Sequence, residues 1–271
     1  MKQLFLPGGG RVAIHFSGND ILQDSIPLVL LHGFSEDSSM WEILVPHLKD
    51  IPMLAIDLPG FGQSDLPAAP NIERYAQAVI GTLDALQVQR FVLVGHSLGG
   101  YVALEIAAHW GDRLAGLGLF HSHPFADDEA LKAARMRSVD MLRSGKRDLI
   151  VSQLFPRLFS ASFASKHPDV LNAMIEQGKK QSAEGLAYGH LAMMSRADHQ
   201  ETLKKVSFPV LFLLGTADDL VPLEKAWQTA LLPNISSIEV MEGVAHMGMF
   251  EATSQSATVI QSFYGMARLF S

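Results

Sequence analysis

Ser97 stands in the segment Gly95–Gly100, which reads GHSLGG and directly follows the apolar run Phe91–Val94. An Ala-rich segment with a helical pattern begins directly after it. A serine on a tight strand-to-helix turn is held in a strained backbone conformation that exposes its hydroxyl, and flanking glycines let neighbouring backbone approach without a Cβ clash. The segment lacks the third glycine of a dinucleotide site and the Gly-Lys-Ser/Thr ending of a phosphate loop. It therefore predicts a nucleophilic serine.

A nucleophilic serine needs a base that takes its proton and a third group that orients the base. In one known chain order the acid follows a late strand and the histidine lies near the C-terminus. The apolar run Pro209–Leu214 is followed by Asp218 and Asp219. The strand-like run Ile238–Met241 is followed by His246. The sequence thus offers an acid and a base in the required order.

Several short segments match strand-end patterns of one enzyme family, in the same order along the chain. They are LHGF at residues 31–34, DLPGFGQS at residues 57–64, the segment around Ser97, GTADDLVP at residues 215–222, and His246 with Glu251 beyond it. On these segments the chain resembles α/β-hydrolase-fold enzymes of the esterase, lactonase and haloperoxidase-like group. The resemblance spans nearly the whole sequence and constrains residues 122–206 least.

The resemblance implies a role for each member of a catalytic triad. Ser97 would attack an acyl carbon, and His246 would take its proton and later deliver it to the leaving group. Asp218 would hold the imidazole in the right tautomer and stabilise the imidazolium. Asp219 is the rival acid, but the family spacing falls on Asp218. The run Leu114–Phe120 ends without an Asp, which removes the usual alternative position.

The resemblance also implies an oxyanion hole and some residues of a substrate pocket. Backbone N–H groups of Leu98, directly after the nucleophile, and of Phe34 are expected to stabilise the oxyanion. Trp41, His123 and Phe125 are expected to line the pocket. Ordinary packing of the first helix would account for the tryptophan equally well.

His121 and His123 form an H-x-H pair, and two histidines at this spacing can ligate a metal. No further ligands fall at a metallohydrolase spacing, and the serine machinery makes a metal redundant. We therefore expect no metal and no cofactor. The individual roles of the two histidines stay open, with one of them expected at the pocket entrance.

Short apolar runs alternate with helical patterns in the first half of the chain. The strand-like runs are Arg11–Phe16, Leu28–Leu31, Met53–Ile56, Phe91–Val94 and Leu114–Phe120, and the helix-like segments are Met40–Leu48, Asn71–Leu86 and Leu98–Trp110. Runs from Leu28 onward are continuously apolar, as expected for strands that are buried on both faces of a parallel sheet. The alternation predicts an α/β fold with a mostly parallel, doubly wound sheet, in agreement with the α/β-hydrolase fold.

Residues 122–206 contain only helical patterns, and strand–helix alternation resumes after them. The helical patterns are Asp128–Arg143, Arg147–Phe159, Pro168–Lys180 and Glu184–Lys205, and the later elements are Pro209–Leu214, Leu223–Leu231, Ile238–Met241 and Thr253–Leu269. We therefore expect an α/β-hydrolase core of residues 1–121 and 207–271, with an all-helical cap, or lid, inserted at residues 122–206. The insertion holds 13 Lys and Arg against 10 Asp and Glu, whereas the rest holds 8 against 18. Attraction between cap and core explains this asymmetry most simply, and a preference for anionic substrates is a second hypothesis.

Composition excludes several classes of protein. The chain has 271 residues, 48% of them hydrophobic, so it is not disordered. Its net charge of −7 disfavours binding to nucleic acid. It has no Cys, which removes thiol nucleophiles and disulfides. The N-terminus lacks a signal-peptide core and no apolar run approaches a membrane span, so we expect a cytoplasmic protein with no membrane partner and a small-molecule acyl substrate.

The sequence favours a serine hydrolase that cleaves a small carboxylic ester, lactone or thioester through an acyl-enzyme on Ser97. Relatives use the same triad for C–C bond hydrolysis, elimination or cofactor-free perhydrolysis, and analogy of fold does not separate these reactions. A ligand receptor or regulatory protein on a hydrolase scaffold is a third possibility. Epoxide hydrolase and dehalogenase activities are disfavoured, because relatives with those activities carry Asp where this chain has Ser97. The oligomeric state is left open.

Overall fold

An eight-stranded sheet forms the centre of the computed structural model, which describes residues 2–6, 10–17, 25–48 and 50–270. The strands are β1 (Lys2–Phe5), β2 (Arg11–Ser17), β3 (Leu28–Leu31), β4 (Met53–Ile56), β5 (Phe91–His96), β6 (Leu114–Phe120), β7 (Val210–Gly215) and β8 (Ser236–Met241). Their order across the sheet is β1-β2-β4-β3-β5-β6-β7-β8. Only the pairs β1–β2 and β2–β4 are antiparallel among the strands described. The predicted mostly parallel sheet is confirmed.

The central strands are fully buried, which is why their sequences are continuously apolar. Every residue of β3, β4, β5, β6 and β7 lies in the interior. Parallel strands need crossover connections that cover both faces of the sheet, so such strands have no polar side. The α/β class predicted from this pattern is therefore confirmed.

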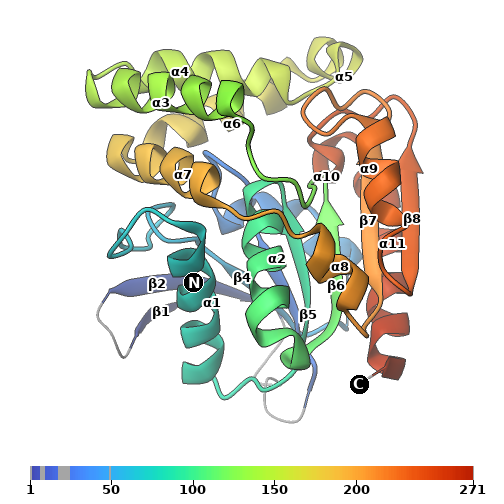
Figure 1. The fold of residues 1–271 in the computed structure, drawn as a ribbon. Helices are drawn as coiled ribbons and strands as arrows, with labels where there is room; N and C mark the ends of the chain where they lie inside the picture. The colour runs from blue at the N-terminus through green and yellow to red at the C-terminus, as the bar shows by residue number, and fades with distance from the viewer. Residues whose placement is uncertain (1, 7–9, 18–24, 49, 271) are drawn as a thin grey trace.

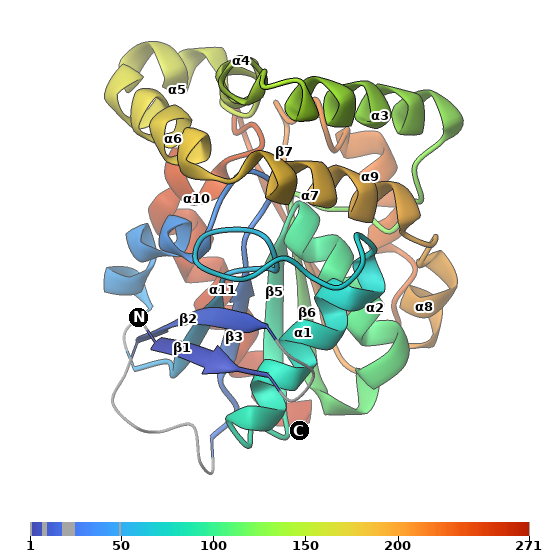
Figure 2. The ribbon, with the colours of Figure 1, turned by 90° about the vertical axis from the view of Figure 1, so that its left-hand side faces the viewer.

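Helices cover both faces of the sheet. The α-helices that follow core strands are α1 (Ile72–Ala85), α2 (Leu98–Trp110), α9 (Leu223–Ala230), α10 (Gly248–Glu251) and α11 (Thr253–Ala267). Figure 2 shows α1 and α2 on one side of the sheet and α11 on the other. Asn71 caps the start of α1 through its side chain, as expected. None of the helices in the described part of the chain is long and apolar enough to cross a membrane.

Residues 122–206 contain helices and no strand. The helices are α3 (Glu129–Arg143), α4 (Arg147–Leu154), α5 (Ala161–Lys166), α6 (Pro168–Lys180), α7 (Ala183–Ser195) and α8 (Gln200–Lys205). Helices α3 to α7, which we call the cap helices, gather at one end of the sheet, whereas α8 lies beside α2 (Figure 1). The division into a core of residues 1–121 and 207–271 and a cap of residues 122–206 stays our proposal.

Several local features differ from the predictions. The segment expected as one helix from Glu184 to Lys205 is broken between α7 and α8, where the buried Arg196 side chain turns inward. The segment Met40–Leu48 forms two short 3₁₀ helices, η1 (Ser38–Ile43) and η2 (Val45–His47), instead of an α-helix. Pro46 contributes to this break, because proline has no N–H for a helical hydrogen bond. Strand β1 was not predicted.

Candidate active site

Ser97 lies on the turn between β5 and α2 in a strained backbone conformation. Its φ is +48°, a value that non-glycine residues rarely adopt. The turn is fixed by two hydrogen bonds: the Ser97 amide donates to the Phe120 carbonyl at 3.0 Å, and the Ser122 hydroxyl donates to the Ser97 carbonyl at 2.9 Å. A Cβ at Gly95 would lie 2.3 Å from the Gly99 carbonyl oxygen. Glycine at position 95 is therefore required for this turn.

His246 and Asp218 form a buried hydrogen-bonded pair. His246 Nδ1 lies 2.8 Å from Asp218 Oδ2. The other oxygen, Oδ1, accepts hydrogen bonds from the amides of Leu220 and Val221 at 2.9 and 3.1 Å. Burial raises the pKa of Asp218, but the charge of His246 and hydrogen bonds from the rings of His121 and His246 outweigh it, so the pKa lies below its ordinary value. By contrast, Asp219 is exposed.

The second nitrogen of the His246 ring is available for proton transfer. Nε2 is buried and has no hydrogen-bond partner among the described residues. Ser97 and His246 line the same cavity, of about 520 Å³. Since Nδ1 is turned toward Asp218, Nε2 is the nitrogen that remains to exchange a proton with a group in this cavity.

His121 is a second imidazole beside the same carboxylate. Its Nδ1 lies 3.0 Å from Asp218 Oδ2, and its side chain is fully buried. Burial lowers the pKa of His121 to about 4, against the opposing effect of Asp218, so the ring is neutral near pH 7. Ligand atoms of His121, Asp218 and His246 lie within 4.8 Å of one another, so they could hold a metal by distance alone. Two imidazoles around one carboxylate oxygen account for this proximity without a metal.

The loop after β3 presents the Phe34 amide expected in the oxyanion hole. His32 shapes this loop, because its Nδ1 lies 2.7 Å from the Gly33 carbonyl oxygen and its Nε2 accepts from the Leu58 amide at 2.8 Å. The amides of Phe34 and Leu98 donate no hydrogen bond to any residue in the described part of the chain. Neither N–H group is therefore committed to a partner within this part of the chain, and Phe34 lines the cavity.

A buried Glu36–His96 pair, which no sequence motif predicts, connects this loop to the loop that carries His246. His96 Nδ1 lies 3.2 Å from Glu36 Oε2, and His96 Nε2 lies 2.9 Å from the carbonyl oxygen of His246. The same Glu36 oxygen accepts from the Gly33 amide at 2.7 Å. Burial opposes the charge on each partner, but their mutual attraction prevails: the pKa of Glu36 is lowered and that of His96 is raised.

Two of the residues expected to line the pocket lie elsewhere. His123 lines the cavity, as does Phe34, but Trp41 and Phe125 do not. Trp41 is buried with its ring centroid 6.1 Å from that of Phe120, because η1 turns this side chain into the core. Phe125 packs beside His123, with ring centroids 5.5 Å apart. These two expectations are corrected.

Several residues that line the cavity were not predicted. They include Tyr101 on α2, Arg135 and Ser138 on α3, Arg157 after α4, and His190 on α7. Tyr101 has a defined hydrogen-bond role. The Phe125 amide donates to His123 Nδ1 at 3.3 Å, so His123 Nε2 carries the hydrogen and donates to the Tyr101 hydroxyl at 3.2 Å. The hydroxyl's own hydrogen is then free for another acceptor.

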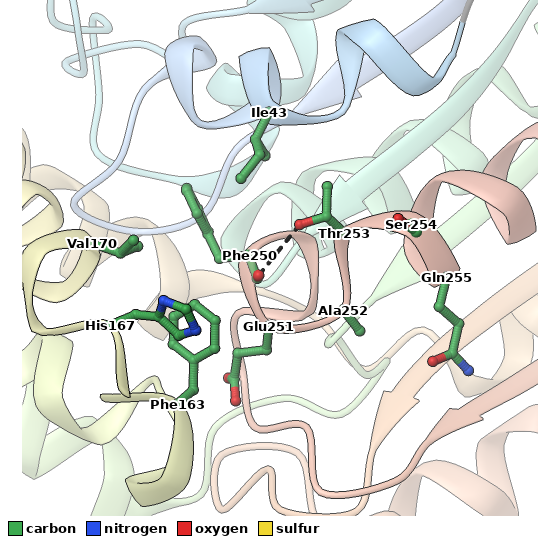
Figure 3. A pocket seen from close by; sticks show the side chains of 10 residues that line it. All are labelled: Ile43, Phe163, His167, Val170, Phe250, Glu251, Ala252, Thr253, Ser254 and Gln255. Carbon is green, nitrogen blue, oxygen red and sulfur yellow. Dashed lines mark hydrogen bonds between the residues drawn. The ribbon is translucent and has the colours of Figure 1, made fainter. Parts of the chain in front are cut away.

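Glu251 joins the cap helices to the loop that carries the catalytic histidine candidate. Its two oxygens accept from the amides of Ala245 and Ser160, each at 3.2 Å. The His246 amide also donates to the Leu158 carbonyl at 2.9 Å. Figure 3 shows Glu251 in a second cavity, of about 510 Å³, whose lining includes neither Ser97 nor His246.

Comparison with known proteins agrees with this fold. A family model described as alpha/beta hydrolase fold matches residues 26–253. A 2-succinyl-6-hydroxy-2,4-cyclohexadiene-1-carboxylate synthase from Enterobacter is 29% identical over 76% of this chain and 83% of its own. A pimeloyl-[acyl-carrier protein] methyl ester esterase from Legionella pneumophila is 27% identical over 88% of this chain and 95% of its own.

The solved structure of a thermophilic esterase from Thermogutta terrifontis, with malate bound, is 28% identical and superimposes with a TM-score of 0.92. The match covers 98% of this chain and 99% of that chain. The chain therefore belongs to the alpha/beta hydrolase fold family and is an enzyme of the hydrolase type.

Proposed function

We propose that this enzyme is a serine hydrolase that cleaves a small carboxylic ester, lactone or thioester through an acyl-enzyme on Ser97. The observation that carries this proposal is the orientation of His246, whose Nδ1 is held by Asp218 while the unpartnered Nε2 belongs to the cavity that Ser97 lines. The names of two similar proteins, a methyl ester esterase and a thermophilic esterase, support the ester class.

In the first half of the reaction, Ser97 Oγ attacks the carbonyl carbon and its proton passes to His246 Nε2. The negatively charged Asp218 stabilises the imidazolium that forms. The developing oxyanion would take hydrogen bonds from the free amides of Phe34 and Leu98, and one such donor contributes about 3–4 kcal/mol to the transition state. The carbon–oxygen or carbon–sulfur bond then breaks, and His246 returns the proton to the leaving group.

In the second half, water takes the place of the alcohol or thiol. His246 accepts a proton from the water as it attacks the acyl carbon, and the bond to Ser97 Oγ breaks as the proton returns to that oxygen. The sum is one ester or thioester plus water giving one acid plus one alcohol or thiol. No step requires a redox or group-carrying partner.

Labelling of Ser97 by a fluorophosphonate, together with turnover of p-nitrophenyl acetate and longer esters, tests the proposal. We expect labelling and turnover in the wild type and neither in Ser97→Ala. Ser162→Ala, which removes an exposed serine on α5, is the matched control and should keep both. Absence of labelling in the folded wild type would contradict the proposal. One acylation burst without turnover would favour a receptor.

Elimination or C–C bond hydrolysis is a second possible outcome of the same experiment, because one relative is named as a synthase. Elimination and C–C hydrolysis can use the same three side chains, so a substrate panel must include carbon–carbon analogues of each ester. Faster turnover of these analogues than of every ester and thioester, with Ser97 still labelled, would move the enzyme to that class.

A further inference from the structure

We infer that the cap side of the active-site cavity binds a carboxylate of the substrate, with Arg135 as its ionic partner and His190 as a neutral hydrogen-bonding partner. The substrate would then be an ester, lactone or thioester that carries a free carboxylate apart from the scissile group. This inference rests on the proposed function, since it names the class of substrate that would acylate Ser97.

The first observation is an excess of positive charge beside the cavity. Asp127 is buried, and its two oxygens lie 2.6 Å from Arg135 Nε and 2.6 Å from Arg196 Nη1. The single negative charge of Asp127 neutralises only one of the two guanidinium groups, so the cluster has a net charge of one positive. Charges in a partly buried site are screened less than charges on an open surface, so this excess attracts an anion strongly.

The two arginines differ in what they have left to offer. Arg196 is buried, donates to the carbonyls of Phe125 and Met193 at 2.9 and 2.8 Å, and stacks over the Tyr101 ring at 4.0 Å. Its Nη2 is buried without a partner among the described residues, but Arg196 does not line the cavity. Arg135 uses only Nε on Asp127, and its Nη groups make no hydrogen bond to any residue in the described ranges. Since Arg135 lines the cavity, its guanidinium is the one that can meet a ligand.

The second observation is an unpartnered buried histidine in the same lining. His190 on α7 is 9% exposed, and neither of its ring nitrogens has a hydrogen-bond partner among the residues described. Its ring lies against that of Phe34, with centroids 4.4 Å apart. Burial, and next the charge of Arg135, lower the pKa of His190 to about 3, so the ring is neutral and offers one N–H donor. A buried polar group without a partner is costly, and a ligand oxygen would relieve that cost.

The remaining charged groups of the lining favour one orientation of the substrate. The acidic ones, Glu36 and Asp219, belong to core loops, and the basic ones, Arg135 and Arg157, belong to the cap. Glu36 is already paired with His96, whereas Asp219 would repel an anion from the triad loop. The scissile carbonyl is therefore expected at Ser97 and the carboxylate at Arg135.

The test compares two series of p-nitrophenyl esters. One series consists of mono-p-nitrophenyl esters of C6 to C8 dicarboxylic acids, and the other carries a methyl ester in place of the free carboxylate. We expect the wild type to prefer the anionic series in kcat/KM by about tenfold or more, because a charge-assisted bidentate contact is lost in the neutral series. Similar kcat/KM for both series at every length would overturn the inference while leaving the proposed function in place.

Substitutions test whether Arg135 and His190 cause the preference for anionic esters. Arg135→Gln should lower kcat/KM for the anionic esters about 10- to 100-fold, mainly through KM, and change the neutral esters little. Arg135→Lys should recover part of the loss, and His190→Phe should lower the anionic series specifically. Arg137→Gln, which makes the same charge change at an exposed position of α3, is the matched control and should behave as wild type. Equal losses in Arg135→Gln and Arg137→Gln would count against the site.

A binding measurement separates this inference from the proposed function and does not depend on turnover. Adipate is titrated by calorimetry into Ser97→Ala and into Ser97→Ala/Arg135→Gln, each first checked for a wild-type circular dichroism spectrum. We expect the second variant to bind at least about tenfold more weakly. Absence of binding to both variants, or equal binding to both, would overturn the inference even if every ester is hydrolysed. Specific binding without any ester turnover would instead count against the proposed function alone.

Discussion

Asp218→Asn is expected to remove most of the activity of the folded enzyme, and the same change at Asp219 is expected to have little effect. Asp218 is 5% exposed, with His246 Nδ1 on one oxygen and two loop amides on the other. Asn keeps an oxygen for the amides, so its NH₂ group faces the imidazole. That group is a donor and favours the tautomer in which Nε2 carries the hydrogen and cannot accept a proton.

The expected magnitude comes from the equivalent substitution in another Ser–His–Asp triad. The corresponding change in a Ser–His–Asp triad lowers kcat about 10⁴-fold, which is roughly 5.4 kcal/mol at 1.36 kcal/mol per tenfold. The lowered pKa of Asp218 also stabilises the fold. For an acid with a lowered pKa this contribution is present above the unfolded pKa, near 3.9, and is lost as the pH falls through the folded value. The melting temperature of Asp218→Asn should therefore lie below that of wild type at pH 7, and the difference should shrink below about pH 3.9.

The assay is kcat on p-nitrophenyl butyrate at pH 8, with circular dichroism and the rate of fluorophosphonate labelling measured on the same samples. Asp219→Asn is the matched control, because it makes the same change at an exposed position one residue away. We expect its kcat to stay within about threefold of wild type. A large loss in Asp219→Asn together with a near-normal Asp218→Asn would refute the assignment of the acid and the reasoning from its hydrogen bonds.

Three further predictions concern the turn, the buried pair and the cap. Gly95→Ala should destabilise the fold by at least about 1–3 kcal/mol in urea unfolding, because the new Cβ would meet a carbonyl oxygen, and an unchanged midpoint would contradict this. Glu36→Gln should lower the melting temperature most between about pH 4.5 and 6.5, with exposed Glu42→Gln as control. The contribution of Glu36 to stability disappears as the pH falls through its lowered pKa, and that of His96 disappears as the pH rises through its raised pKa. A difference in melting temperature that does not change with pH would refute the pairing. The kcat/KM for anionic esters should fall with added salt more than that for neutral esters, and equal salt dependence would argue against attraction by the cap.

The core of the fold and the triad candidates were predictable because local backbone requirements restrict the residue types. Ser97 has positive φ in a turn where position 95 tolerates no Cβ, and such a turn has a recognisable sequence. The central strands are buried on both faces, so their apolar runs have no competing interpretation. In each case the physical constraint acts on residues that are neighbours in the chain.

Contacts between distant segments were not predictable in the same way. Glu36 and His96 are 60 residues apart, and nothing in the spacing of either indicates the other. His121 was noticed only as half of an H-x-H pair, although its contact is with Asp218 on another strand end. For Trp41 the sequence leaves pocket lining and ordinary packing equally open, and the 3₁₀ helix that carries it packs the side chain in the core.

Residues 122–206, our proposed cap, contribute more to the site than an apolar cover over the proposed triad. Their Asp127–Arg135–Arg196 cluster brings charge to the cavity, and their Leu158 carbonyl accepts the amide hydrogen of His246 itself. A change in the position of this segment would therefore disturb the loop that holds the imidazole as well as the surface that we propose binds the substrate carboxylate. Substitutions near the hydrogen bond between the His246 amide and the Leu158 carbonyl should therefore alter kcat together with KM. Loss of the Arg135 charge should act mainly on KM.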